Sequence, residues 1–343
     1  MVRLQDIAAR AQVSVMTVSK ALRDAPDISA NTKARIKLLA QQMGYVPDSV
    51  ARGLRNRKSN LFGLIIPSSA DPFFARVAAA IQEAAFEAGY DVIVSHTTGL
   101  IEREEACIRR LLSRRVDGIF IAPVNRLGAS VTAYDELARR RLPVVILGHR
   151  SPFCAPFVSA EPDDLTASQN ATRYLIEIGH RRIAFFTGPL ASASTAERIE
   201  GYRRALREAR LEPDDHLIFS AGDSMADGEK AALQLLNEKT DPTAVQTFND
   251  LVAIGAANIF LKQGIKIPED LSLVGFGNIL IAEYFRVPLT TVRQPKLRLG
   301  IAAVELMLKL VRGERAEARR LPAELIIRAS TAPPKLSGHP GAA

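Results

Sequence analysis

The chain has 343 residues, of which 47% are hydrophobic and 24% charged, a balance typical of a folded globular protein and not of a disordered or fibrous one. No apolar run approaches the roughly 18 residues that a membrane-spanning helix needs. The start, MVRLQD, lacks the apolar stretch of a secretory signal. We therefore expect a cytoplasmic protein with no membrane partner. The two cysteines, Cys107 and Cys154, have no metal or redox spacing, which fits a reducing compartment.

The positive charge is concentrated at the start of the chain. Residues 1–60 contain eleven Lys or Arg against four Asp, a net charge of +7 out of the +8 of the whole chain. A basic head on a nearly neutral body predicts a polyanion as partner of the head alone. Nucleic acid is favoured over a lipid surface, because these residues contain no long amphipathic helix with an aromatic face.

Residues 1–46 are expected to form a small domain of three short helices. Four apolar residues with helical spacing predict a first helix that buries one face: Leu4, Ile7, Ala8 and Ala11. Ser14 is placed to cap a second helix, 15–22. A third helix is expected over 32–43 and ends at Gly44. Residues 47–60, with Pro47 at their start and many Arg and Lys, read as a linker that becomes helical when something binds.

Residues 61–331 alternate strand-like and helix-like segments, which is the pattern of βαβ units and parallel sheets. Six apolar runs are expected strands: 61–67, 91–95, 118–122, 143–148, 243–248 and 271–277. They fall into two sets, so we predict two doubly wound lobes with ligand space between them. The first lobe takes about 61–160 and 291–320, and the second takes about 161–290 and 321–331, with a late helix at 297–313 and a late strand at 324–330. Residues 332–343 are expected to be disordered.

Catalytic chemistry is missing from the sequence. No GxSxG elbow, P-loop or HExxH motif occurs, and the five His residues are scattered. GFGNIL (275–280) begins like a dinucleotide fingerprint but lacks its third Gly, and His180 is better explained by capping or packing than by catalysis. We therefore predict no catalytic residue, no cofactor and no metal site.

Nine motifs in a fixed order resemble one family of bacterial transcription regulators, the lactose/galactose-repressor family. They are DIAARAQVSVMTVSKAL, GYVPDSVARGL, SSADPFF, RRVDGIF, YLIEIGHRRIAF, GPLASASTAERIEGY, NDLVAIGA, SLVGF and PLTTVRQP. The resemblance covers residues 2–331. It implies a helix-turn-helix DNA-binding domain, a hinge that folds on operator DNA, and a periplasmic-binding-protein-like core whose two lobes are joined by three crossovers.

The resemblance also implies which residues contact operator DNA. Val15, Met16 and Lys20 match base-reading positions, where apolar side chains meet thymine methyls and Lys donates to guanine. Five residues match phosphate-contact positions: Thr17, Ser19, Ser29, Thr32 and Tyr45. In the hinge, Leu54 matches a leucine that wedges open a base step, flanked by Arg52 and Arg55 facing phosphate. Gln12 departs from the family's Gly or Asn at the turn, and a left-handed backbone there would cost about 1 kcal/mol.

Effector-binding residues are implied in the same way. Ten residues match cleft positions of the family: Asp71, Phe73, His149, Ser192, Ser194, Arg198, Asn249, Asp250, Asn278 and Gln294. Phe74 is expected in the core instead. Two positions depart from the family, because Gly277 and His149 replace residues that are acidic or aromatic in relatives. With fewer acids and an added His and Arg, the cleft would favour an anionic sugar acid.

These observations together predict a homodimeric, sequence-specific repressor. Its partners are operator double-stranded DNA and a small effector, which is a sugar, a sugar acid or a sugar phosphate. Two alternatives remain at this point. A solute-binding receptor without a DNA role would fit the core alone but predicts an export signal and a neutral head. A sugar-processing enzyme fused to a DNA-binding domain would need an acid–base constellation, which the sequence does not nominate.

Overall fold

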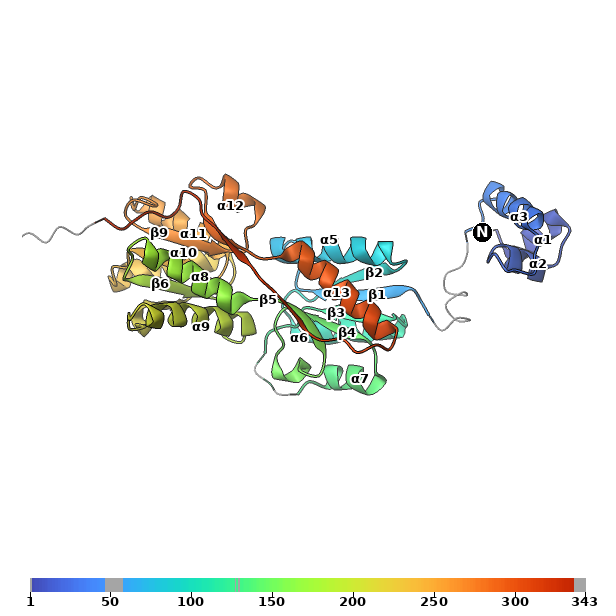
Figure 1. Ribbon diagram of the computed structural model, residues 1–343, viewed down its shortest axis with the longest axis horizontal. Coiled ribbons are helices and arrows are strands. Elements are labelled where there is room, and N and C mark those ends of the chain that lie inside the picture. The colour runs from blue at the N-terminus through green and yellow to red at the C-terminus, as the bar shows by residue number, and fades with distance from the viewer. Residues whose placement is uncertain (1, 47–57, 127, 129, 336–343) are drawn as a thin grey trace, which may run out of the picture. The chain divides into compact units, whose positions relative to one another are not determined.

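The structure is a computed structural model that describes residues 2–46, 58–126, 128 and 130–335. The chain divides into two compact units, Met1–Ser59 and Asn60–Ala343 (Figure 1). In the part of the first unit that the structure describes, residues 2–46 and 58–59, three helices occur: α1 (Leu4–Ala11), α2 (Val15–Ala21) and α3 (Ala30–Gln42). The second contains two six-stranded sheets. None of the described helices is long and apolar enough to cross a membrane.

The N-terminal unit is held together by a small core and two serine caps. Ile7, Val18 and Ile36 are fully buried at the centre of the three helices. The Ser14 Oγ accepts a hydrogen bond from the Thr17 amide at 3.0 Å, and the Ser29 Oγ accepts one from the Thr32 amide at 3.3 Å. These caps satisfy backbone donors that a helix start leaves free. The predicted three-helix fold is confirmed, with α3 starting two residues earlier than expected because Ser29 caps it.

The first lobe is a parallel sheet with helices on both faces, and its strand order is β11-β5-β4-β3-β1-β2. Helices α5 and α13 pack on one face, and α6 and α7 on the other. Its strands are β1 (Leu61–Ile66), β2 (Asp91–His96), β3 (Gly118–Ile121), β4 (Val144–Leu147), β5 (Val158–Pro162) and β11 (Arg319–Leu321). Its helices are α5 (Pro72–Glu87), α6 (Ile101–Ser113), α7 (Thr132–Arg140), α13 (Lys296–Val311) and the 3₁₀ turn η1 (Pro152–Cys154). Parallel strands covered on both faces explain the continuous apolar runs of this segment.

The second lobe repeats this plan with the strand order β12-β10-β9-β8-β6-β7, in which only the β10–β12 pair is antiparallel. Helices α8 and α9 pack on one face, and α10 and α11 on the other. Its strands are β6 (Ile183–Thr187), β7 (Ile218–Ser220), β8 (Ala244–Thr247), β9 (Ser272–Phe276), β10 (Thr290–Arg293) and β12 (Glu324–Ile326). Its helices are α8 (Asp164–Glu177), α9 (Ala193–Glu208), α10 (Met225–Glu238), α11 (Asp250–Lys262), α12 (Leu280–Tyr284) and the 3₁₀ turn η2 (Asp215–Leu217). The predicted pair of doubly wound lobes is confirmed.

Three crossovers join the lobes, after β5, after β10 and between β11 and β12 (Figure 1). The predicted lobe boundary at residue 291 is wrong, because β10 belongs to the second sheet, where Thr291 pairs with Gly275 of β9. The strand is rich in threonine, so it does not appear as an apolar run. The late strand ends at Ile326 and not at 330.

The predicted disordered tail begins too early. Residues 332–335 are described, and the Ala332 carbonyl accepts a hydrogen bond from the buried His180 Nε2 at 3.0 Å. The His180 Nδ1 lies 2.8 Å from the Thr243 hydroxyl. These contacts confirm a packing role for His180, which fastens the C-terminal segment to the second lobe. Residues 336–343 lie outside the described part of the chain.

Gln12 ends α1 in a left-handed conformation, with φ 53° and ψ 44°. Because a Cβ disfavours this region, we expect Gln12→Gly to raise the unfolding free energy of the N-terminal unit by about 1 kcal/mol. Amide hydrogen exchange of α1–α3 in the full chain measures the effect. The matched control is Gln41→Gly, the same change inside α3, which should lower stability by about 1 kcal/mol. Equal signs for the two variants would contradict the prediction.

Candidate functional site

A cleft opens between the two lobes at the carboxyl ends of their parallel strands, which is where doubly wound sheets bind ligands. Nine of the ten residues predicted to bind effector line it: Asp71, Phe73, His149, Ser192, Ser194, Arg198, Asn249, Asp250 and Gln294. Asn278 is not among the lining residues, and its Oδ1 accepts a hydrogen bond from Arg328 at 2.9 Å. Phe74, expected in the core, packs against the core of the first lobe and also lines the cleft beside Phe73.

The centre of the cleft is a carboxylate that the sequence analysis missed. Asp164, the first residue of α8, is fully buried and follows the first crossover. Arg198 Nη2 lies 2.9 Å from its Oδ2, and Gln294 Nε2 donates to its Oδ1 at 3.1 Å. Burial raises the pKa of this carboxyl, but Arg198 and His149 outweigh that effect and the net pKa is lowered. Asp164 is therefore an anion that gathers side chains from both lobes.

Arg198 is held on three sides and is not a free cation. Besides its ion pair with Asp164, its Nη1 donates to the Phe248 carbonyl. The guanidinium carbon lies 4.4 Å from the centre of the Phe248 ring and 3.9 Å from that of Phe276. Cation–π contacts of this kind strengthen when water is excluded, and Arg198 is only 5% exposed. The arginine is thus a rigid part of the cleft floor, and its positive charge is already compensated.

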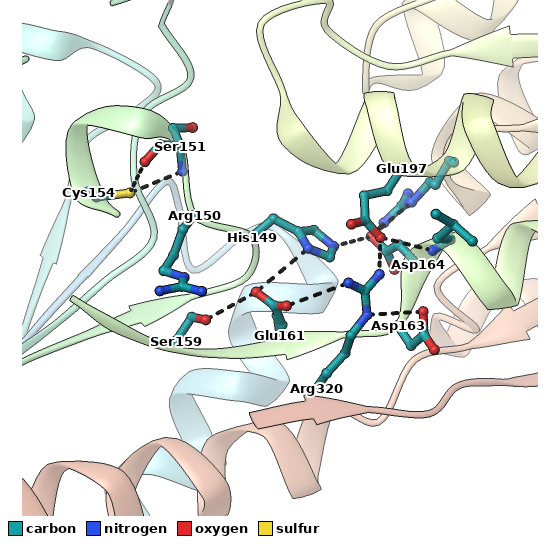
Figure 2. Close-up of polar contacts among 12 residues, drawn as sticks. His149, Arg150, Ser151, Cys154, Ser159, Glu161, Asp163, Asp164, Glu197 and Arg320 are labelled. Carbon is teal, nitrogen blue, oxygen red and sulfur yellow. Dashed lines mark hydrogen bonds and ion pairs between the residues drawn. The ribbon is translucent and has the colours of Figure 1, made fainter. Parts of the chain in front are cut away.

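His149 reaches across from the first lobe, where it follows β4. Figure 2 shows its ring between two carboxylates: Nε2 lies 3.3 Å from Asp164 Oδ2, and Nδ1 lies 3.8 Å from Glu161 Oε2. Burial alone would lower the pKa of the imidazole, but the hydrogen bond and charge of Asp164, with Glu197 and Glu161, raise it overall. This contact ties the first lobe to the start of α8 in the second lobe.

Several predicted cleft residues already have structural partners. Asp71 caps α5 by accepting hydrogen bonds from the amides of Phe73 and Phe74, at 2.8 and 3.2 Å. Asn249 caps α11 through the Val252 amide at 2.8 Å. The fully buried Asp250 accepts a hydrogen bond from the Ile279 amide at 2.8 Å and one from the Thr291 hydroxyl. These side chains shape the cleft wall, and Asp250 in particular holds β10 against the loop after β9.

Asp223 also lines the cleft and was missed, because it lies in a loop without a strong motif. Burial and the nearby Asp227 raise the pKa of Asp223, and burial raises that of Asp71, with Asp223 as a further repulsive charge. These carboxylates, with the Ser192 and Ser194 hydroxyls, offer acceptors for ligand hydroxyl groups. No cluster of metal-ligating side chains occurs among the described residues.

The second helix of the N-terminal unit presents the predicted base-reading side chains at its surface. Val15 is 41% exposed and Met16 is 63% exposed, although both are apolar. Lys20 forms an ion pair with Asp27, so a contact with a base requires that pair to open. Apolar side chains left in water at the start of a recognition helix suit the major groove, where thymine methyls lie.

Three of the predicted phosphate-contact residues, Thr17, Ser29 and Thr32, lie at or near helix starts. The Ser14 and Thr17 hydroxyls are 2.9 Å apart, and so are those of Ser29 and Thr32. Helix N-termini with free donors favour phosphate. Ser19 is half-buried in α2, and Tyr45 packs against the three-helix core. The hinge residues Arg52, Leu54 and Arg55 lie outside the described residues, so their roles stay predictions.

A basic three-helix unit with an exposed recognition helix, in one chain with a two-lobed core and a polar cleft, defines a ligand-responsive DNA-binding regulator. The comparison with known proteins agrees. The model of bacterial regulatory proteins of the lacI family matches residues 3–48. The model of periplasmic binding proteins and the sugar binding domain of the LacI family matches residues 59–329. The chain belongs to the lacI family, and it is a DNA-binding transcriptional regulator with a sugar-binding type of core.

Individual relatives cover nearly the whole chain. The HTH-type transcriptional repressor PurR of Vibrio atlanticus is 34% identical over 93% of this chain and 95% of its own length. The repressor CytR of Escherichia coli is 32% identical over 96% of both. The structure of the Lac repressor dimer bound to operator and the anti-inducer ONPF gives a TM-score of 0.88 at 28% identity, covering 96% of this chain and 99% of that one. The receptor alternative without a DNA role does not account for the match to residues 3–48.

Removing the charge of Asp164 should destabilise the core. We expect Asp164→Asn to lower the unfolding free energy by about 3 kcal/mol, because it leaves the buried Arg198 without its counter-ion. Denaturant unfolding of the full chain measures this loss. The control is Asp163→Asn, the same change at the neighbouring, partly exposed cap of α8, where we expect less than about 1 kcal/mol. Similar losses at both positions would contradict the central role of Asp164.

The raised pKa of His149 predicts a pH-dependent stability. Its contribution is fully present below its ordinary pKa of 6.5 and is lost as the pH rises through the higher pKa of the folded protein. The thermal midpoint of the wild type minus that of His149→Gln should therefore fall between about pH 5.5 and about pH 8.5. This difference cancels the contribution of His180, whose pKa is lowered by burial. A flat difference would contradict the assignment.

Proposed function

We propose that the chain represses transcription from an operator and that its effector is an uncharged, hydroxyl-rich molecule, such as a neutral sugar, bound between the lobes. The observation that carries this proposal is Asp164, on which Arg198, His149 and Gln294 converge in a cleft lined by both lobes. A ligand in that cleft touches both lobes at once. Its affinity therefore depends on how the lobes are arranged, which is the requirement for a switch.

The charge of the cleft argues against the anionic sugar acid expected from the sequence. That expectation counted Arg198 as available, whereas Asp164 already compensates it. Asp71 and Asp223 also face the cleft, and each would repel a carboxylate or phosphate. The same two carboxylates are good acceptors for hydroxyl groups.

The apolar part of the cleft supports a ring-shaped ligand. Phe73 and Phe74 pack edge to face, with ring centres 5.1 Å apart, at the start of α5. Both line the cleft from the first lobe, opposite the Ser192 and Ser194 segment of the second lobe. A sugar has an apolar face of C–H groups and a rim of hydroxyls, so it matches one wall of aromatic rings and one of polar groups.

The switch follows from the order of the parts along the chain. The hinge segment, residues 47–60, connects the helix-turn-helix unit to β1 of the first lobe. Effector binding would change the angle between the two lobes of each subunit. In a homodimer this would shift the two first lobes relative to each other, and their spacing would determine whether the two attached hinge segments fold on DNA. In this proposal the chain acts in the cytoplasm, by binding DNA and effector and without catalysing a reaction. Relatives named transcriptional repressors support this proposal.

An apolar surface on the second lobe supports the homodimer. Leu280 and Tyr284 of α12 are 80% and 76% exposed, and Ile281 between them is 49% exposed. Contiguous exposed apolar side chains mark interaction sites more often than free surface. The Lac repressor structure with a TM-score of 0.88 is a dimer bound to operator. In our proposal, a second copy of this chain covers the apolar surface of α12.

Charging this surface should separate the subunits. We expect Ile281→Asp to raise the dimer dissociation constant at least about tenfold, because a desolvated carboxylate at an interface lacks a partner. Sedimentation velocity across a dilution series measures it. The control is Leu233→Asp on α10, an apolar residue that is similarly exposed at 44%. Equal dissociation of both variants would remove α12 from the interface.

The function is tested with a duplex selected from a random library by the full-length protein. Neutral sugars, sugar acids and sugar phosphates are screened by thermal shift, and each hit is titrated against the protein–duplex complex. We expect a neutral sugar to stabilise the protein and to change operator affinity about tenfold or more. Asp223→Asn should lower the affinity of the protein for that sugar, whereas Asp214→Asn, at the cap of η2, should leave the affinity unchanged.

Two results would overturn this proposal. Hits found only among acids or phosphates would refute the neutral class of effector. A hit that stabilises the protein without changing operator affinity would refute the switch.

A further inference from the structure

Arg320 lies outside the cleft, in contact with carboxylates that adjoin the charged centre of the cleft. It is the middle residue of β11, at the edge of the first sheet, where it pairs with Glu161 of β5. Its side chain is 40% exposed, and it is not among the residues that line the cleft. Figure 2 shows its guanidinium between carboxylates below His149.

Three carboxylates from different parts of the core meet this guanidinium. The Nε donates to Asp163 Oδ1 at 3.1 Å, at the first crossover. An Nη atom pairs with Glu197 of α9, in the second lobe, and the other lies 3.8 Å from Glu161 Oε1, in the first lobe. A planar fork with several donors is suited to such bridging, and a single ammonium is not. Arg320 therefore connects the two lobes through their acidic side chains.

The same carboxylates lead directly into the cleft. Glu161 faces Arg320 with one oxygen and the His149 Nδ1 with the other, at 3.8 Å each. Glu197 is the chain neighbour of Arg198 and accepts a hydrogen bond from the Leu165 amide at 3.2 Å. One carboxylate thus links Arg320 to each cationic partner of Asp164. Glu161 contacts His149, and Glu197 precedes Arg198 in the chain.

Charge makes this arrangement dependent on Arg320. Four carboxylates converge at the first crossover: Glu161, Asp163, Asp164 and Glu197. Facing them are Arg198, Arg320 and, when protonated, His149. Without Arg320, the three carboxylates that it binds would repel one another in a half-buried site. Separation of the lobes would relieve that repulsion.

We propose that Arg320 is a positioning residue for the effector response: it clamps carboxylates of both lobes and thereby holds His149 and Arg198 on Asp164. The inference rests on the proposed function in that the cleft must bind the effector. It adds a residue of β11, just before the third crossover, that sets the lobe arrangement without touching the ligand.

The pKa of His149 in Arg320→Gln tests the clamp by the sign of its change. If Arg320 only adds positive charge, its removal raises the pKa of His149. If Arg320 holds the lobes, its removal takes His149 away from Asp164, and the pKa falls toward its ordinary value of 6.5. The pH titration of ¹³C-labelled histidine in the ligand-free, full-length protein reads it, with His149→Gln assigning the signal. A fall supports the proposal, and a rise or no change overturns it.

Hydrogen exchange provides a second measurement on the same samples. The Leu165 amide reports on Glu197 directly, so its exchange should become roughly tenfold faster in Arg320→Gln. The control is Arg319→Gln, whose side chain is 38% exposed and pairs with Glu305 inside the first lobe. It should leave both the histidine titration and the Leu165 amide unchanged. Unchanged exchange in Arg320→Gln, or equal effects of both variants, would overturn the clamp.

Neither measurement requires an effector, so the two proposals fail separately. If no sugar alters operator binding while His149 and Leu165 respond as expected, the clamp stands and the proposed function fails. If sugars change the operator affinity of the wild type, but Arg320→Gln gives the same histidine titration and Leu165 exchange as Arg319→Gln, the function stands and the clamp fails.

Discussion

The burial of one carboxylate, that of Asp164, determines how the core is organised. A charged oxygen without water is tolerated only when cations and donors surround it. Arg198 comes from the second lobe, His149 from the first and Gln294 from a crossover, and all three reach Asp164. The cleft is therefore built around an anion that belongs to the protein. The strongest charges of the cleft are thus paired within the protein itself.

That constraint connects stability to regulation. Because the partners of Asp164 come from both lobes, the interactions that stabilise the core also fix the angle at which the lobes meet. A ligand that favours another angle works against these contacts, and one that favours the present angle adds to them. The outer carboxylates Glu161 and Glu197 extend the same network to Arg320 in β11, the strand that precedes the third crossover. In the proposed switch, these charged groups at the lobe junction set the lobe arrangement that the hinge segments and the dimer then transmit to DNA.

The DNA-binding unit follows a different physical principle. Its core is small, and its helices depend on local devices such as the Ser14 and Ser29 caps. The left-handed Gln12 shows that the turn is retained even with a residue that this conformation disfavours. Exposed Val15 and Met16 contribute nothing to that core. They are explained by contact with another molecule, and the net charge of the first 60 residues indicates that the molecule is a polyanion.

Sequence patterns named most of the residues that line the cleft but not the acids that pair with its cations. Nine of the residues that the resemblance implied line the cleft, because they follow strand ends, and their role in binding an effector stays a prediction. The resemblance omitted Asp164 and Asp223, which no apolar run or motif singles out. With these acids left out, Arg198 appeared unpaired and an anionic ligand appeared favourable. Phe74, expected in the core, packs against the core of the first lobe and lines the cleft as well, because its ring lies at the boundary between the two.

Features that depend on neighbours along the chain could be predicted from the sequence: the three short helices, the alternation of strands and helices, the basic head and the family. Tertiary structure alone decided which distant groups meet. Gln294 and Asp164 are 130 residues apart in the chain, and Arg320 and Asp163 are 157 apart. Sheet pairing likewise decided which lobe contains each late strand: β11 lies in the first, and β10 and β12 lie in the second. Periodicity and propensity describe local backbone preferences, whereas pairing of buried charges depends on the path of the whole chain.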